Sequence, residues 1–275
     1  MNHIIRMKTH GLFLILALFA FAVSAQNDSQ KQVSDSLALI SLEEVQLIGI
    51  RANDNTPVTC TNITQKELAP RNLGQDIPIL LNYLPAVVTT SDAGAGIGYT
   101  GIRVRGTDAT RVNVTINGIP YNDSESQGTF WVNLPDFASS VEEIQLQRGV
   151  GTSTNGSAAF GASLNIKTSA LTDKSFAEFS SSVGSFNSSK NSLQFSTGLL
   201  NERFTLSGRL SQIKSDGYVD RSRSNLKSYF FQATYQDENT LIKGLLFGGH
   251  EITYQSWYGL DTLTLQTDRR SNPAG

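Results

Sequence analysis

The run 141–168 constrains the fold more than any other part of this 275-residue chain. Apolar Ile144 and Leu146 alternate with polar residues until Arg148 and Gly149, a pattern typical of a strand that ends in a turn. A glycine-punctuated segment of small residues follows and leads into a second alternating strand, 162–168. The run therefore predicts a compact unit of strand, loop with one tight helical turn, and strand.

The segment before this unit predicts a small α+β domain. Thr64 followed by Glu67 is a capping-box pattern, which predicts a short helix that ends near Pro70. Apolar residues at helical spacing predict a second helix over 75–84, which Pro85 stops. Alternating or β-branched runs predict strands at 87–90, 102–105 and 112–116, and Asn117 with Gly118 predicts a hairpin turn to Ile119 and Pro120.

These segments resemble the plug domain of TonB-dependent outer-membrane receptors. That family has segments of the types Ile-Arg-Ile-Arg-Gly and Asp-Gly-Val-Pro, and 102–106 and 117–120 correspond to them here. The strand ending in Arg-Gly at 148–149 and the Asn-Ile-Lys-Thr strand at 165–168 follow in the family's order. Ala86 and Asn117 depart from the usual glycine and aspartate, but both preserve small size or turn geometry. The resemblance covers 42–168 and implies a plug domain at 54–169.

After the predicted plug, the segment 170–275 consists of alternating runs of about 10 residues with polar turns between several of them. Apolar residues on one face and small or polar residues on the other are typical of transmembrane β-strands, although a soluble β-sandwich alternates in the same way. The predicted fold class is an α+β plug domain followed by antiparallel transmembrane β-strands of an incomplete 22-stranded β-barrel. Because about five strands cannot close such a barrel, we expect the N-terminal portion of a longer receptor.

The N-terminus predicts export from the cytoplasm. Arg6 and Lys8 precede an apolar run, 12–23, and a small-residue cleavage site ends at Ala25, so 1–25 is predicted to be a signal peptide. The apolar run has about a dozen residues, fewer than the ~20 that a transmembrane helix needs. The predicted location after cleavage is the outer membrane of a Gram-negative type of cell.

The polar segment 26–53 is predicted to be flexible and periplasmic. It contains a β-prone run at 42–49, which the resemblance implies is the TonB box, where an extended peptide adds a strand to the energising protein TonB. The alternative is that this run is simply the first strand of the domain. The residues predicted to bind TonB are Glu44, Val45, Gln46, Leu47 and Ile48.

Two loops are candidates for ligand binding. The run 96–101 spells a dinucleotide fingerprint, but a strand rather than a helix follows it, which argues against a pyrophosphate site. The loop 121–131 mixes hydrogen-bonding groups with aromatic residues, as surfaces that hold a bulky polar ligand do; packing of its aromatic residues beneath the loop is the alternative. The resemblance implies that both loops face the outside, with Asp92, Tyr99, Asn122, Asp123, Gln127, Phe130 and Trp131 as ligand-binding residues.

Charged residues in the predicted strands are candidates for holding the plug inside the barrel. The resemblance implies ion pairs and hydrogen bonds between such residues and the barrel wall. The alternative is a set of solvated charges, each contributing ~0 to 1 kcal/mol. The predicted locking residues are Arg103, Arg105, Glu142, Glu143 and Arg148.

Several other functions are disfavoured. No nucleophile, base and orienting group stand out as a set, so we expect no catalytic residues and no enzyme activity. Cys60, the single cysteine, is predicted to be a small buried hydrophobe, and His250 is the one histidine after the signal peptide, so we expect neither a metal site nor a cofactor. Asp123 and Glu125 lack calcium-loop spacing. The balance of 22 basic against 24 acidic residues offers no footprint for nucleic acid.

The resemblance implies a TonB-dependent outer-membrane receptor that takes up a bulky nutrient. The expected cargo is a ferric siderophore or other iron chelate, with cobalamin and oligosaccharide left open. The expected partners are the TonB energising complex, the small-molecule ligand and outer-membrane lipid. The alternative is a secreted binding or adhesion protein that combines a small α+β domain with a β-sandwich.

Overall fold

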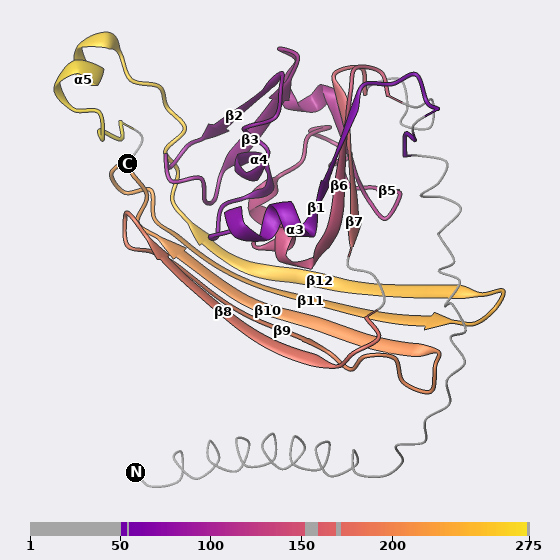
Figure 1. Ribbon diagram of the computed structural model, residues 1–275. Coiled ribbons are helices and arrows are strands. Elements are labelled where there is room, and N and C mark those ends of the chain that lie inside the picture. Colours follow the sequence, from indigo (N-terminus) through magenta and orange to yellow (C-terminus); the bar gives the residue numbers. More distant parts are fainter. Residues whose placement is uncertain (1–50, 54, 152–158, 169–171, 274–275) are drawn as a thin grey trace, which may run out of the picture. The chain divides into compact units, whose positions relative to one another are not determined.

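The computed structural model describes residues 51–53, 55–151, 159–168 and 172–273, all within one compact unit. The predicted signal peptide, the predicted TonB-binding residues 44–48 and most of the loop before the second strand of the 141–168 unit lie outside the described residues. Two regions follow each other along the chain (Figure 1). We call residues 51–168 the N-terminal domain and the strands β8 to β12 the long sheet.

The N-terminal domain is built on a mixed sheet in the order β1-β6-β7-β4-β5. Its centre is the predicted strand–loop–strand unit, because β6 (Val141–Arg148) and β7 (Ala162–Thr168) pair with each other in antiparallel register. β1 (Cys60–Thr64) pairs with the other edge of β6, and β4 (Val112–Ile116) runs parallel to β7. The strand that carries Cys60 leaves its thiol partly exposed rather than buried as predicted.

The predicted hairpin is confirmed at β4 and β5 (Ile119–Pro120). Asn117 and Gly118 connect the strands with φ values of 49° and 82°. Positive φ at both central residues is what a tight hairpin turn matching the twist of the sheet requires, and asparagine followed by glycine tolerates it best. The local turn residues therefore determined this feature.

Short helices surround this sheet. α3 (Gln65–Leu68) begins at the predicted capping box, in which the Thr64 backbone N–H donates to Glu67 Oε2 at 2.8 Å, and η2 (Ala69–Arg71) continues it. α4 (Ile77–Leu80) is much shorter than the predicted helix 75–84, since the residues after it form i→i−3 turns up to Pro85. The remaining short helices are η3 (Ala109–Arg111), η4 (Trp131–Asn133) and η5 (Phe137–Ser140). None of the described helices has the length and apolarity to cross a membrane.

The apolar core of the N-terminal domain lies between its sheet and these helices, with β2 (Val87–Ser91) and β3 (Thr100–Val104) forming a separate pair beside it. Leu81, Ile144 and Leu164 are completely buried there. Phe137 extends the core to the long sheet, because its ring lies 5.7 Å from that of Phe230 and 5.3 Å from that of Phe247.

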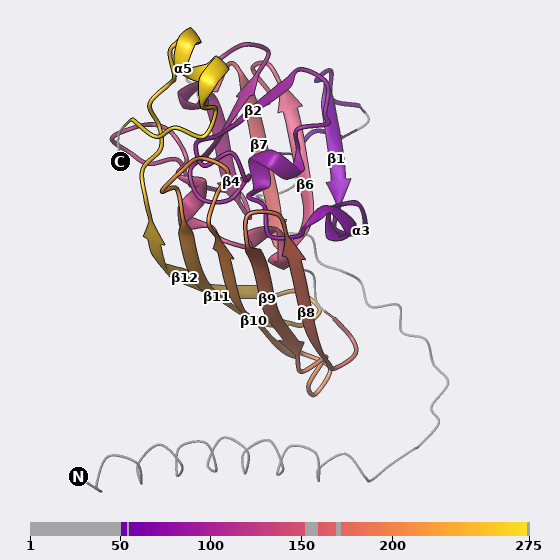
Figure 2. The ribbon, with the colours of Figure 1, turned by 90° about the vertical axis from the view of Figure 1, so that its left-hand side faces the viewer.

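The long sheet consists of consecutive antiparallel strands, as predicted (Figures 1 and 2). Turns at 197–203 and 237–240 connect strands at one end, the turn end. The opposite end, the loop end, carries the tight turn 185–187 and the segments 216–223 and 254–273, the last of which includes α5 (Thr262–Thr267). The strands are β8 (Phe176–Gly184), β9 (Ser188–Ser196), β10 (Phe204–Ser215), β11 (Ser224–Gln236) and β12 (Leu241–Thr253).

The two faces of the long sheet are reversed relative to a soluble protein. Its buried residues are mostly polar, including Lys190, Arg209 and Gln232, with Ile213, Leu226 and Phe230 as apolar exceptions that pack in clusters with the N-terminal domain. Soluble sandwiches instead pack two apolar faces together. The pattern is that of transmembrane strands with a polar inward face. The exposed apolar residues of the outward face are Phe179, Val183, Leu193, Phe204, Leu206, Leu210, Tyr229, Ile242, Leu246 and Ile252.

Candidate functional site: loop face and anchor of the N-terminal domain

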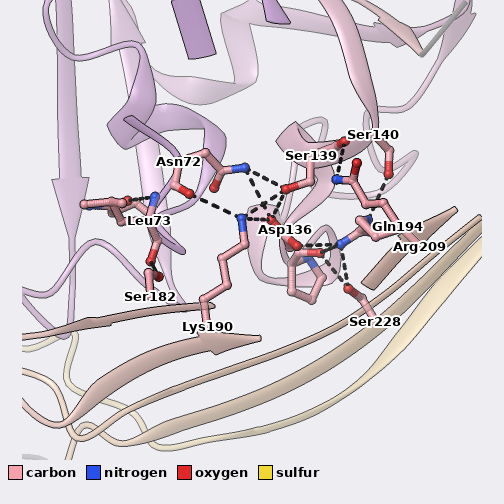
Figure 3. Close-up of polar contacts among 12 residues, drawn as sticks. Asn72, Leu73, Asp136, Ser139, Ser140, Ser182, Lys190, Gln194, Arg209 and Ser228 are labelled. Atoms are coloured by element: carbon pink, nitrogen blue, oxygen red, sulfur yellow. Dashed lines mark hydrogen bonds and ion pairs between the residues drawn. The ribbon is translucent and has the colours of Figure 1, made fainter. Parts of the chain in front are cut away.

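A buried ion cluster joins the N-terminal domain to the long sheet (Figure 3). Asp136 precedes η5 in a left-handed conformation (φ 55°), and its side chain is completely buried. Its Oδ1 lies 2.6 Å from Lys190 Nζ on β9, and its Oδ2 lies 3.1 Å from Arg209 Nη1 on β10. The side chains of Lys190 and Arg209 are themselves only 5% and 3% exposed. One carboxylate thus connects the domain to two neighbouring strands.

Hydrogen bonds complete this cluster. Lys190 Nζ donates to Ser139 Oγ at 3.0 Å, and Arg209 Nε donates to Ser140 Oγ at 2.8 Å. Gln194 Nε2 donates to the Ser139 carbonyl at 2.9 Å. Burying ions is costly unless their remaining donors and acceptors are also paired, so these bonds are what allow the cluster to exist away from water. Ser228 Oγ and Ser182 Oγ add bonds of 2.8 Å to the carbonyls of Pro135 and Leu73.

The electrostatics of the cluster favour an ionised Asp136. Burial by itself raises the pKa of this carboxyl, but the positive charges of Arg209 and Lys190 outweigh burial and lower the pKa from 3.8 to about 2. Because the pKa is lower in the folded state, the cluster contributes its full stability above about pH 4 and loses it as the pH falls through about 2.

The predicted locking residues make their described contacts inside the N-terminal domain. Glu143 pairs with Arg51 at 2.8 Å, and Glu142 pairs with Lys167 at 3.1 Å. Arg148 donates to the Pro85 carbonyl and to Thr61 Oγ1, both at 2.9 Å. Arg103 and Arg105 are exposed. Their locking role stays a prediction, and the anchor that the structure describes is the Asp136 cluster.

Sequence reasoning did not single out Asp136. Its context, an aspartate after Pro135 and before a short helical turn, is typical of an ordinary turn residue. Its partners belong to strands that begin far along the chain, so no local pattern connects them. The one available signal was the occurrence of Lys190 and Arg209 at inward-facing positions of strands whose other inward residues are uncharged.

The loop between β2 and β3 lies against the loop end of the long sheet. The backbone N–H groups of Tyr218 and Val219 both donate to the Ala93 carbonyl, at 2.8 and 3.2 Å. Thr253 Oγ1 donates to Tyr99 Oη at 3.4 Å. The predicted ligand residues Asp92 and Tyr99 are therefore held beside the loops of the long sheet, and partial burial raises the pKa of Asp92.

A buried acid that the sequence did not single out supports this loop. The Asp76 backbone N–H donates to the Gly96 carbonyl at 3.0 Å, and its Oδ2 accepts a hydrogen bond of 2.8 Å from Thr100 Oγ1. Burial raises the pKa of Asp76 well above its usual value, against the opposing effect of the Thr100 bond. Asp76 thus ties the middle of the loop and the first residue of β3 to the start of α4.

The second predicted ligand loop, between β5 and η4, is attached to the edge of β4. Asn122 Oδ1 accepts from the Val114 backbone N–H at 2.7 Å, and its Nδ2 donates to the Val112 carbonyl at 3.0 Å. Asp123 accepts from the Ser126 backbone N–H at 2.7 Å, and these turn bonds lower its pKa. A hollow of about 260 Å³ brings three predicted ligand residues together, with the lining Thr110, Val112, Asn113, Asn122, Asp123, Ser124, Gln127 and Ala159.

The two aromatic residues of this loop differ. Phe130 is 49% exposed, whereas Trp131 is only 2% exposed and packs in the core. Packing beneath the loop, the alternative raised by the sequence, therefore describes Trp131, and Phe130 is the aromatic side chain open to a ligand. Within the described ranges, no three His, Cys, Asp or Glu side chains are grouped to hold a metal ion.

Comparisons with known proteins agree with this arrangement. A family model described as the TonB-dependent Receptor Plug Domain matches residues 52–163. The vitamin B12 transporter BtuB of Vibrio vulnificus (strain YJ016) is 31% identical over 157 residues, which cover 57% of this chain and 25% of the transporter.

Solved structures share the fold of the described region. The siderophore receptor PirA from Acinetobacter baumannii aligns with a TM-score of 0.55 and 21% identity, over 71% of this chain and 32% of PirA. The copper transporter OprC aligns with a TM-score of 0.60 and 17% identity, over 72% of this chain and 32% of OprC. The chain spans between a quarter and a third of the length of these proteins.

Proposed function

We propose that this chain serves in the outer membrane for energised uptake of a bulky nutrient. Residues 52–163 match the model of the TonB-dependent receptor plug domain, and the antiparallel strands that follow share the fold of solved structures such as OprC. The observation that carries the proposal is the reversal of the long sheet, with charged and polar residues buried and apolar residues exposed. Such a sheet fits surroundings in which one face contacts lipid and the other face lines a polar interior.

The same observation disfavours a secreted binding or adhesion protein. Each large apolar side chain left in water forgoes about 1.5 to 3 kcal/mol of burial free energy, so a continuous row of them is costly in a soluble β-sandwich. An adhesin would also bury apolar rather than charged residues between its sheets. Lys190 and Arg209 occupy such buried positions here.

We assign ligand recognition to the two loops described above, with Asp92, Tyr99, Asn122, Asp123, Gln127 and Phe130 as the candidate contacts. The cargo that we propose is a ferric siderophore or other iron chelate, because PirA, which shares the fold, is a siderophore receptor. BtuB is a vitamin B12 transporter and OprC a copper transporter, so cobalamin and copper belong in the test. The segment 44–48 remains the proposed contact with TonB.

Uptake measurements test this function. Cells lacking the gene, and the same cells with the gene restored, are supplied with radiolabelled ferric siderophores, cobalamin or copper, with and without a working TonB. We expect uptake of one iron chelate that requires both the gene and TonB. Uptake that is unchanged by loss of TonB, or secretion of the protein into the medium, would refute the proposal.

A substitution in the proposed TonB box separates binding from energised transport. Val45→Pro removes a backbone donor from the strand that would pair with TonB, so uptake should fall to the level without TonB while ligand binding to cells persists. Ser34→Pro, in the same polar segment, is the control and should transport normally. Equal uptake by both variants would refute the assignment of the TonB box to residues 44–48.

A further inference from the structure

A row of polar side chains crosses the outward face of the long sheet near its loop end. Antiparallel register places Ser181, Asn191, Gln212, Lys227 and His250 opposite one another on the successive strands β8 to β12. These side chains lie on the face that carries the exposed apolar residues, opposite to the face that contacts the N-terminal domain. Lys214 lies one row further toward the loop end, on β10.

The row marks the edge of an apolar band. The next row toward the turn end contains Phe179, Leu193, Leu210 and Tyr229, and three further rows down to Phe204 and Ile242 are apolar or glycine. Rows on one face lie about 6.8 Å apart, so the four apolar rows span about 20 Å between their Cα atoms. Adding the side chains, this approaches the apolar band of ~25 Å that outer-membrane barrels present to lipid. The polar row therefore lies at headgroup level.

The loop end corresponds to the outer side of the membrane. Outer-membrane barrels have short turns on the periplasmic side and longer loops outside. Here the turn end has 197–203 and 237–240, and the loop end has the tight turn 185–187, the segment 216–223 and the described part of the segment after β12, 254–273, which is the longest of them. The lipid that meets the polar row is therefore a lipid of the outer leaflet.

The polar row borders a hollow of about 500 Å³ on the outward face. A Cβ atom at Gly248 would lie 2.8 Å from Tyr229 Oη, so glycine at this position leaves room for the tyrosine ring beside the hollow. The hollow has a cationic and amide rim, with Asn191, Gln212, Lys227 and His250, and an apolar floor, with Phe179, Leu193, Leu210 and Tyr229.

The charges of this rim are all of one sign. Lys214 and Lys227 are exposed and form no ion pair with any described residue. The acidic residues of the long sheet, Glu178 and Glu251, are each adjacent in sequence to outward residues and therefore belong to the inward face. The outward positions of the strands thus offer ammonium and amide donors without a carboxylate. The exposed Asp216, two residues after Lys214, lies beyond the end of β10 and forms no ion pair with either lysine.

We propose that this hollow binds a phosphorylated lipid of the outer leaflet, with Lys214 and Lys227 facing the phosphate and the acyl chains lying along the apolar floor. The inference rests on the proposed outer-membrane location. A phosphorylated lipid fits both parts of the hollow, because its anionic headgroup complements the cationic rim and its acyl chains complement the apolar floor.

Lipid retention tests the proposal. The protein is extracted from outer membranes in a mild detergent, and bound lipid is counted by native mass spectrometry after addition of diphosphorylated lipid A or of lipid A stripped of its phosphates. The double variant Lys214→Gln with Lys227→Gln is compared with Lys66→Gln with Arg269→Gln. The control removes the same charge from exposed sites on α3 and on the segment after β12.

We expect retention of diphosphorylated lipid A to fall roughly tenfold or more in the rim variant, since each lysine near an anionic surface is worth about fivefold. The control variant should retain as much diphosphorylated lipid A as the unaltered protein does. The phosphate-free lipid should bind the control variant and the unaltered protein only as weakly as diphosphorylated lipid A binds the rim variant. Equal retention by rim variant and control, or equal retention of the two lipids, would overturn the proposal. Displacement of the lipid by inorganic phosphate alone would also overturn it, because the apolar floor would then contribute nothing.

Membrane fractionation keeps this outcome separate from the function. Both variants and the unaltered protein are first located in the cell. Absence of the unaltered protein from the outer membrane would refute the proposed function and with it the lipid site. Normal insertion and uptake with unchanged lipid retention would refute the lipid site alone.

Discussion

The N-terminal domain and the long sheet bury opposite kinds of residue. Ile144, Leu146 and Leu164 form the apolar interior of the domain, as in a water-soluble protein. The long sheet buries Lys190 and Arg209 instead and exposes its leucines and phenylalanines. The two regions therefore depend on different surroundings. The domain carries its own core, whereas the sheet depends on the domain to cover its polar face and exposes on the other face the apolar residues that we propose contact lipid.

At η5 the two regions meet through an apolar contact and an ionic contact that lie next to each other. Phe137 contacts the rings of both Phe230 and Phe247, and Asp136 beside it binds Lys190 and Arg209. The apolar contact continues the core of the domain, and the ionic contact satisfies charges of the sheet that water would otherwise solvate. Each region therefore supplies what the other lacks at this junction.

The largest effect is expected from breaking the ionic contact. Asparagine adopts the left-handed conformation of residue 136 as readily as aspartate, so Asp136→Asn changes the charge and not the backbone. It leaves two buried cations without a counter-charge, and we therefore expect the free energy of unfolding to fall by about 3 to 5 kcal/mol. Urea unfolding in lipid vesicles, followed by the fluorescence of buried Trp131, measures it. Glu125→Ala, which removes an exposed carboxylate of the same domain, should change little.

A compensating variant sharpens this result. Adding Lys190→Met and Arg209→Met to Asp136→Asn removes the unpaired charges and should recover most of the lost stability, because apolar replacement of a buried ion cluster is often neutral or better. A triple variant as unstable as the single one would mean that the cluster acts through geometry rather than charge.

The next largest effect is expected on the outward face. Leu246→Arg places a charge in the apolar band and should destabilise the inserted sheet by about 2 to 4 kcal/mol, whereas Val183→Arg, at the loop end, should cost about 0 to 1 kcal/mol. The measurement is the fraction of each variant recovered in the outer membrane and its urea midpoint in vesicles. Equal behaviour of both variants would contradict the assignment of this face to lipid.

The smallest effect is expected on the pH dependence of the free energy of unfolding, to which two buried acids of the N-terminal domain contribute in opposite directions. Asp76 has a raised pKa, so its stabilising contribution is complete below pH 3.8 and is lost as the pH rises toward the folded-state pKa. Asp136 has a lowered pKa and loses its contribution in the opposite direction, between pH 3.8 and about 2. Asp76→Asn should therefore flatten the decline of stability with rising pH. Parallel pH profiles for Asp76→Asn and the unaltered protein would contradict the burial of an acid at this position.

Local sequence patterns predicted much of the fold. Asn117 and Gly118 specified the hairpin of β4 and β5, and the alternation around Ile144 and Leu164 specified β6 and β7. The two-residue period after 170 predicted about five antiparallel strands with apolar residues on one face and polar residues on the other. These turns and strands depend on residues that are neighbours in the sequence, so they can be predicted without a structure. The extent of α4 was misjudged because the turns that follow it depend on packing rather than on helical spacing.

The sequence by itself determined the strands, the turns and the sidedness of the long sheet, because side chains two positions apart necessarily share a face of an extended strand. Only the tertiary structure decided which charges meet. Glu142 and Glu143 pair within the N-terminal domain, whereas Asp136 reaches strands that follow much later in the chain. A buried ion pair depends on distances of a few ångströms between distant segments, and no periodicity along the chain encodes such distances.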